Sequence, residues 1–360
     1  MPALFKLLAF TIPIQLSLHF DFWDSTVYGF KIDYLISTFY LSDILASLVI
    51  LFGIKNIKLS IKHYVLSIMY LAFALYNIHN SLFIIPAVYR WFKITEMLLL
   101  GLVIINYKKY KIFEYFVKPL SYSIMMACIL GILQFINNGS IGGLFYLLGE
   151  RSFSFIEPGI APYPYSFFPH PNAFAGFLLV FGIFVLQYRK KFNKKYFWLL
   201  AILVGINLIL TNSLNVYITA ALLLVISQKF LVFSFVSLDF LPRFVSHRIE
   251  LINSSIQMIK DNFWFGVGLN NFIPNLVKYS KNFLYSWELQ PVHNIFLLVF
   301  SELGVVGFIA FCFLVFSSLS AIRYSLFAVI VTGLSDHYWL TLQQNMLLFT
   351  FVVALSKIKK

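Results

Sequence analysis

His293 stands where a long polar loop runs into an apolar segment, and its type and position suit it to acid–base chemistry. The sequence there reads Val292-His-Asn-Ile-Phe-Leu-Leu-Val-Phe-Ser-Glu-Leu-Gly304. A histidine titrates near neutral pH and can take a proton from a hydroxyl group as a general base. We therefore regard His293 as a candidate catalytic base. The alternative is that it only caps an apolar segment at its polar edge.

Helical geometry would relate His293 to the residues that follow it. In a regular helix, at about 100° per residue, Gly304 and Gly307 lie near the face of His293. Two glycines on that face would let a neighbouring helix approach closely. Glu302 would lie on the opposite side and roughly 13 Å deeper, so we do not expect it to orient His293.

Other histidines fall in loops near the ends of apolar segments. His170, His337 and Asp336 could form a metal site with His293, but their spacing matches no compact ligand motif, so we predict no metal. Asn172 follows Pro171 at the start of an apolar segment, where it would line an outer cavity or cap a helix.

Two acidic residues lie inside apolar segments. Asp43 and Glu96 are costly to bury at membrane depth unless they are paired or hydrated. They would serve either the ion path of a transporter or a polar contact between helices.

The composition indicates an integral membrane protein. The 360 residues are 60% hydrophobic and 11% charged, whereas soluble chains carry about 25% charged residues. The net charge of +13 comes from basic residues in short loops, and with no nucleic-acid-binding motif we predict no nucleic-acid partner. Cys128 and Cys312 both fall in apolar segments and predict no disulfide framework.

The apolar segments predict an all-α polytopic protein with about twelve membrane-spanning helices. The segment at 229–241 is short for a span and would need tilt or local thinning of the bilayer. The expected spans lie at 4–20, 35–54, 63–79, 88–106, 119–137, 171–188, 196–211, 213–228, 229–241, 292–317, 322–337 and 340–356.

Charge in the loops predicts the orientation. Most of the 27 basic residues lie in alternate loops, most densely at 189–195, and the positive-inside rule puts these loops and both termini in the cytoplasm. The long loops at 137–170 and 242–291 are then extracytoplasmic, and function concentrates on loops of a rigid scaffold. We expect residues 1–360 to form a single membrane domain in the cytoplasmic membrane.

Several motifs resemble those of the O-antigen ligase and O-antigen polymerase superfamily. The carriers of the resemblance are Phe265-Gly-Val-Gly-Leu-Asn-Asn-Phe272, the His293 segment, Pro169-His-Pro-Asn-Ala-Phe-Ala-Gly176, Asp336-His-Tyr-Trp339 and Gln343-Gln344. Arg248 matches a basic position before the Gly-Val-Gly motif. The ligase-like core would span about residues 119–317.

The resemblance implies a glycosyltransferase that moves a glycan from undecaprenyl diphosphate to the hydroxyl of a lipid or glycan acceptor. His293 would take the acceptor proton, with no metal, nucleotide or other cofactor. Arginine grips phosphate oxygens with a planar fork, so the diphosphate ligands would be Arg248, Arg151 and Arg243. The substrate cavity would be lined by Asn172, Asn294 and Asp336.

The chain departs from the family pattern at two arginine positions. Family members commonly carry a Ser-Arg pair where this chain has Ser213-Leu214, and some carry arginine in the stretch that here reads Pro162-Tyr163 and onward. A polymerase that extends the glycan on a second lipid carrier is an open alternative. A polysaccharide-lipid flippase or transporter is the rival from another class; it would need ionisable groups along a central path.

Overall fold

The computed structural model describes residues 1–57, 60–107, 111–152, 163–226, 241–280, 288–318 and 323–358, most of them helical. The helices are α1 (Pro2–Thr11), α2 (Leu41–Gly53), α3 (Ile61–His79), α4 (Ile84–Asn106), α5 (Lys118–Asn137), α6 (Leu144–Leu147), α7 (Pro171–Gln187), α8 (Lys194–Leu210), α9 (Leu214–Ile226), α10 (Leu241–Asp261), α11 (Phe272–Tyr279), α12 (Ile295–Phe316), α13 (Arg323–Gly333), α14 (Tyr338–Thr341) and α15 (Gln343–Lys357). Short strands are β1 (Ser17–Phe20), β2 (Thr26–Val27), β3 (Phe30–Lys31) and β4 (Ser37–Tyr40).

The predicted first span, 4–20, is wrong. Helix α1 ends at Thr11, and β1 then pairs antiparallel with β4, with Ser17 opposite Tyr40. The physical reason is visible in residues 15–20, where polar and apolar side chains alternate with the two-residue period of a strand. The second predicted span likewise begins at Leu41 rather than 35, because β4 precedes α2. The fold is therefore mostly, but not wholly, α-helical.

The helices fit a membrane protein. Among the described residues, Phe113–Asn137 and Ile295–Phe316 are long and apolar enough to cross a membrane. Large apolar side chains also face outward, which soluble monomers rarely allow over a wide area. On α3 these include Val65, Ile68, Met69 and Leu75, and on α8 they include Trp198, Ile202, Ile206 and Ile209. The count of twelve spans stays a prediction, and the segment 229–241 lies, except for Leu241, outside the described residues.

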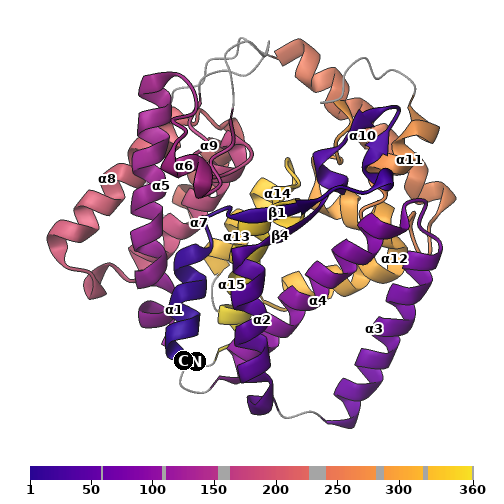
Figure 1. The fold of residues 1–360 in the computed structure, drawn as a ribbon, viewed down its shortest axis with the longest axis horizontal. Helices are drawn as coiled ribbons and strands as arrows, with labels where there is room; N and C mark the ends of the chain where they lie inside the picture. The colour runs from indigo at the N-terminus through magenta and orange to yellow at the C-terminus, as the bar shows by residue number, and fades with distance from the viewer. Residues whose placement is uncertain are drawn as a thin grey trace.

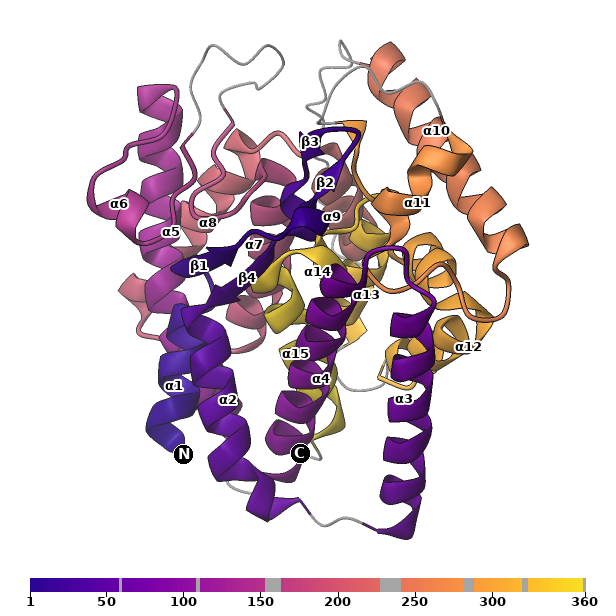
Figure 2. The same cartoon turned by 45° about the vertical axis from the view of Figure 1, so that its right-hand side comes forward.

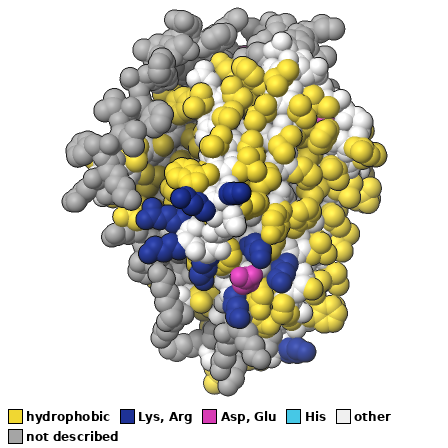
Figure 3. All heavy atoms as spheres, turned by 90° about the vertical axis from the view of Figure 1, so that its left-hand side faces the viewer, with side chains coloured by type: hydrophobic (Ala, Val, Ile, Leu, Met, Phe, Trp, Pro, Cys, Tyr) yellow, Lys and Arg dark blue, Asp and Glu magenta, His cyan; other side chains and the backbone are white. Residues whose placement is uncertain are grey.

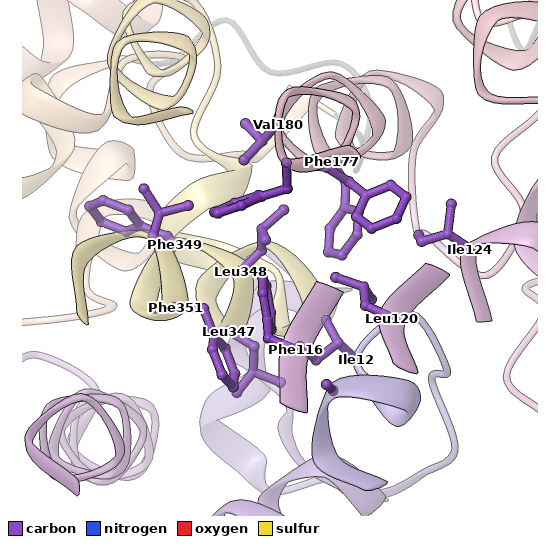
Figure 4. Close-up of a cluster of buried hydrophobic side chains, with 14 of the residues drawn as sticks. Ile12, Phe116, Leu120, Ile124, Phe177, Val180, Leu347, Leu348, Phe349 and Phe351 are labelled. Atoms are coloured by element: carbon purple, nitrogen blue, oxygen red, sulfur yellow. The ribbon is translucent and has the colours of Figure 1, made fainter. Parts of the chain in front are cut away.

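The core forms around α7, a helix that is apolar on all sides and therefore buried. Figure 4 shows side chains of α7, α15 and the segment leading into α5 meeting there. Phe116 stacks on Phe351 with ring centroids 4.4 Å apart, while Phe174, Phe177 and Phe181 are fully buried. This packing fixes the N-terminal end of α7, where a polar cluster begins.

The two termini lie at the same end of the molecule, and α10 and strands β2 and β3 lie toward the other (Figures 1 and 2). Figure 3 shows Lys and Arg side chains gathered toward the terminal end of one face, bordered by a broad hydrophobic surface. Termini on one side agree with an even number of spans. Their assignment to the cytoplasm remains a prediction from loop charge.

The long extracytoplasmic loop predicted at 242–291 contains helices instead. Helix α10 buries Leu251, Ser255 and Met258, and presents Ile249 and Ile256 on its exposed side. Half of its residues are polar, so its average hydropathy resembles that of a loop even though its periodicity is helical. The loop predicted at 137–170 contains the short helix α6.

Labelling from the two sides of the membrane would test the orientation. Lys191 follows α7 and Lys278 lies on α11, and both side chains are exposed. In a variant with Cys128 and Cys312 replaced by alanine, we expect a cysteine at 278 to react with an impermeant thiol reagent applied to the extracytoplasmic side. A cysteine at 191 should react only after the membrane is opened. Reaction of both from the same side would contradict the predicted topology.

Candidate active site

His293 lies just outside α12, not on it. The helix begins at Ile295, and the side chain of Asn294 caps it by accepting hydrogen bonds from the backbone N–H groups of Phe296 (2.9 Å) and Leu297 (3.0 Å). The prediction that His293 shares a helical face with the glycines of α12 is therefore wrong. Asn294, predicted to line the cavity, is a cap that also donates to the carbonyl of Leu334 (3.0 Å).

That bond ties the start of α12 to the segment between α13 and α14, which carries Asp336 and His337. Nδ1 of His293 lies 3.6 Å from Oδ1 of Asp336, and the rings of His293 and His337 have centroids 5.0 Å apart. Oδ1 of Asp336 also accepts the backbone N–H of His337 (2.8 Å). The structure thus joins His293 and Asp336, which are 43 positions apart, in one cluster with His337.

Charge and burial set the ionisation of this cluster. Burial by itself would raise the pKa of Asp336, but the adjacent His293 outweighs it and holds that pKa well below the ordinary carboxyl range. Burial, reinforced by the charge of His293, lowers the pKa of His337 to about 3. At neutral pH the cluster therefore contains a carboxylate and an uncharged His337.

The contacts with Thr341 favour one tautomer of His337. With the single hydroxyl proton of Thr341 on the carbonyl of His337 (3.1 Å), its Oγ1 accepts the contact of 2.8 Å from Nδ1–H of the ring. The lone pair of the neutral ring is then on Nε2. Tyr34 packs edge-on against the ring, with centroids 5.4 Å apart.

Two of the three predicted arginines reach the neighbourhood of the cluster. Arg248, on α10, donates from Nη1 to the carbonyl of Ser335 (3.4 Å), one residue before Asp336, and its charge acts on both His170 and His337. Arg151 forms an exposed ion pair with Asp33 (2.9 Å), and its charge also acts on His170. Arg243 lies in the first turn of α10, and its side chain is outside the described part.

Helix α7 points its N-terminus toward the same cluster. His170 caps the helix by accepting the backbone N–H of Asn172 at Nδ1 (3.1 Å), and it interacts electrostatically with Asp336 and His293. Asn172 is half-buried in the first turn of α7, and since His170 is the cap, the prediction that Asn172 caps this helix is wrong. Its role in lining the cavity stays a prediction. The sequence suggests His170 and His337 only as possible metal ligands. Nothing in the residues around them predicts that they lie close to His293.

The two halves of the glycine motif form one backbone unit, here called the glycine join (residues 263–268 and 301–306). Helix α12 is broken at Gly304, whose φ of 63° and ψ of −169° are not helical. Around the break, the backbone N–H groups of Val267, Gly268 and Val305 donate to the carbonyls of Ser301 (2.9 Å), Glu302 (3.1 Å) and Phe263 (2.8 Å) respectively. The expectation of a regular helix packed on another helix is wrong, because a loop fills the break.

Asn77 of α3 completes this scaffold. Its Nδ2 donates to the carbonyls of Phe265 and Glu302 (both 3.1 Å), and its Oδ1 accepts from the N–H of Leu269 (2.9 Å) and from Trp91 (3.0 Å). Asn77 is not among the residues predicted from sequence, although a polar amide in an apolar helix is itself a signal.

Glu302 belongs to the scaffold and not to the cluster. Its Oε1 accepts the backbone N–H of Phe272 (3.2 Å) at the start of α11, and its side chain is buried. Glu302 does not orient His293, in agreement with its predicted position. Asp336 is the carboxylate that lies beside His293.

Asp43 makes a contact between helices. Lys93 of α4 forms a buried ion pair with Asp43 of α2 and also donates to Gln343 of α15 (3.2 Å). Glu96 is buried on α4 without a hydrogen-bond partner among the described residues. For Asp43, the predicted polar contact between helices accounts for the observed interactions.

Comparison with known families supports the resemblance on which the site predictions rest. Residues 171–312 match the family model described as O-antigen ligase. The match runs from the start of α7 into α12 and includes Arg248, the glycine join and His293; Asp336 and His337 follow it. A search of curated proteins finds no match to the chain.

Proposed function

Because residues 171–312 match the family model described as O-antigen ligase, we propose that this chain is a glycosyltransferase of the ligase type. It would move a glycan from a polyprenyl diphosphate to an acceptor hydroxyl at the outer face of the cytoplasmic membrane. The observation that carries the proposal is the pair of His293 and Asp336, 3.6 Å apart, with Arg248 bound to the residue before Asp336.

In the proposed reaction His293 acts as general base through Nε2. It takes the proton of the acceptor hydroxyl while the acceptor oxygen bonds to the anomeric carbon of the donor sugar. The bond from that carbon to the diphosphate oxygen breaks, and the diphosphate leaves with the electron pair. Asp336 accepts Nδ1–H of the ring, which orients it and stabilises the imidazolium that forms. The contact of 3.6 Å must shorten for this, as catalytic hydrogen bonds often do when substrate binds.

The arginines would hold the leaving diphosphate. Among the described residues, Arg248 donates one long hydrogen bond, at 3.4 Å, to a neutral carbonyl, so most of its donors remain for phosphate oxygens. Arg151 is paired with Asp33, but the pair is exposed and such pairs are worth only about 0–1 kcal/mol, so a diphosphate can compete for it. Arg243 would add positive charge from the same helix as Arg248.

These arginines would substitute for the two that the family pattern leads one to expect. Leu214 is an exposed apolar residue at the start of α9. The hydroxyl of Tyr163 accepts a hydrogen bond from Asn212 (3.2 Å), so neither position offers a cation. A polymerase would use the same base and the same clamp on a second lipid carrier, and the acceptor alone would distinguish the two activities.

Replacing Arg248 by lysine tests the diphosphate clamp. Lysine keeps the charge but loses the planar fork that binds two oxygens, so we expect a loss of glycan transfer of at least about tenfold, comparable to one charge-assisted hydrogen bond. Transfer from a polyprenyl-diphosphate-linked glycan would be measured in proteoliposomes. Lys278→Ala is the control, because Lys278 binds Asn275 on α11 and should transfer normally. An Arg248→Lys variant as active as wild type would contradict the clamp.

A further inference from the structure

The separation between His293 and Asp336 has a second meaning. At 3.6 Å, Nδ1 and Oδ1 are too far apart for a good hydrogen bond. Zinc binds nitrogen and oxygen ligands at about 2.0–2.2 Å in a tetrahedral arrangement, which puts two ligand atoms about 3.4 Å apart. Nδ1 of His293 has no hydrogen-bond partner among the described residues. The two atoms are therefore spaced as ligands of one ion.

His337 offers a third potential ligand atom close to these two. One ligand atom from each of His293, Asp336 and His337 lies within 4.8 Å of the other two. The bond from Nδ1 of His337 to Thr341 leaves Nε2 with its lone pair. A ligand histidine typically donates its other N–H to an oxygen that fixes its orientation, and Oγ1 of Thr341 is such an oxygen for His337.

The rest of the site is held in place before any ion binds. Asp336 and His337 are adjacent in the chain and joined by a hydrogen bond of 2.8 Å, and both are buried. Asn294, next to His293, is bonded to Leu334 on the same segment as Asp336. Two imidazoles and one carboxylate suit zinc and related transition metals better than Mg²⁺ or Ca²⁺, which prefer oxygen.

We propose that His293, Asp336 and His337 form a binding site for a zinc-class divalent ion, and that the bound ion switches glycan transfer off. The second half rests on the proposed function. As a base, His293 keeps its proton on Nδ1, facing Asp336, and its lone pair on Nε2. An ion can bind Nδ1 only when that nitrogen holds the lone pair, so the ring proton must lie on Nε2, where it blocks acceptance of the acceptor's proton. Ion binding and base catalysis therefore exclude each other.

Zinc binding can be measured without any transfer assay. The full-length protein in detergent would be stripped with a chelator, incubated with Zn²⁺, desalted and analysed for bound metal. We expect about one zinc per chain, and loss of that zinc in Asp336→Asn and His337→Gln. His19→Gln is the control, because His19 is an exposed histidine on β1 bonded to Thr38 (2.9 Å) and should not affect binding.

A milder variant guards against loss of folding. Thr341→Val keeps the side-chain volume but removes the oxygen that orients His337, so we expect zinc affinity to fall about 10–100-fold, as for other outer-shell substitutions. Cobalt(II) bound in place of zinc would report the ligand field by its visible absorption. Zinc content that is equal in wild type, Asp336→Asn and His337→Gln, or absent from all, would overturn the site.

Transfer assays then test the switch separately. Zinc at saturating concentration should abolish transfer by the wild-type protein, and a chelator should restore it. Full glycan transfer with zinc bound would overturn the proposal that zinc inhibits transfer, but it would not contradict the zinc-binding site itself. Zinc binding by a protein that transfers no glycan under any condition would instead count against the proposed function.

Discussion

The His293→Gln variant should transfer glycan about 10²–10⁴-fold more slowly than wild type, the usual contribution of a positioned general base. Glutamine approximates the size and polarity of histidine but cannot take up the acceptor proton. His293 precedes α12 and its cap, so helix capping by Asn294 should persist. We expect the loss to appear in kcat, with little change in KM for the lipid-linked donor, because the arginines remain.

His293→Ala should show a similar loss, and both variants should insert and purify like wild type. His19→Gln is again the matched histidine control and should transfer normally. Wild-type kcat in His293→Gln would show that the histidine is structural. Catalysis would then have to rest on charge stabilisation by Arg248 and Arg151, and the ligase-type mechanism proposed here would fail.

Gly304→Ala should be a strongly destabilising substitution in the glycine join. Backbone conformations such as that of Gly304 cost side-chain-bearing residues about 1–3 kcal/mol. An added Cβ would also lie 2.4 Å from the backbone of Trp264 and Phe265, which cannot move aside like a flexible side chain. We expect a loss of several kcal/mol, on the scale of other large mutational effects, and poor accumulation in the membrane.

Gly205→Ala provides the control for this prediction. Gly205 lies inside α8, where an added Cβ meets nothing within 4 Å, and alanine favours a helix by about 1 kcal/mol over glycine. Thermal unfolding in detergent should give a lower Tm for Gly304→Ala and an equal or higher Tm for Gly205→Ala. Equal melting of the two variants would mean that the break in α12 is not required for stability.

Local patterns were enough to predict most helices, because each apolar run carries its own signal. The same reasoning failed where one segment depends on another. Strand β1 is stable only through β4, and averaging over residues 4–20 concealed its two-residue alternation. The break at Gly304 is stabilised by a loop about 40 residues earlier, so residues 295–316 alone predict an unbroken helix.

The site was predictable in part for the same reason. His293 and Arg248 lie in motifs that can be recognised from their neighbours in sequence. The contact of His293 with Asp336 requires α12 and α13 to meet, and spacing along the chain carries no information about that. Spacing along the chain is likewise a poor guide to the proposed metal site, since His293 becomes a neighbour of Asp336 and His337 only in three dimensions.

The glycine join also determines which sequence changes this chain can tolerate during evolution. Its two segments bind each other mainly through hydrogen bonds between main-chain N–H and carbonyl groups. Every residue except proline carries both of these groups. Side chains such as those of Phe263 and Trp264, both exposed, are therefore open to replacement. An insertion or deletion between Phe263 and Gly268 is different, since it would shift every partner by one position and separate α11 from Glu302.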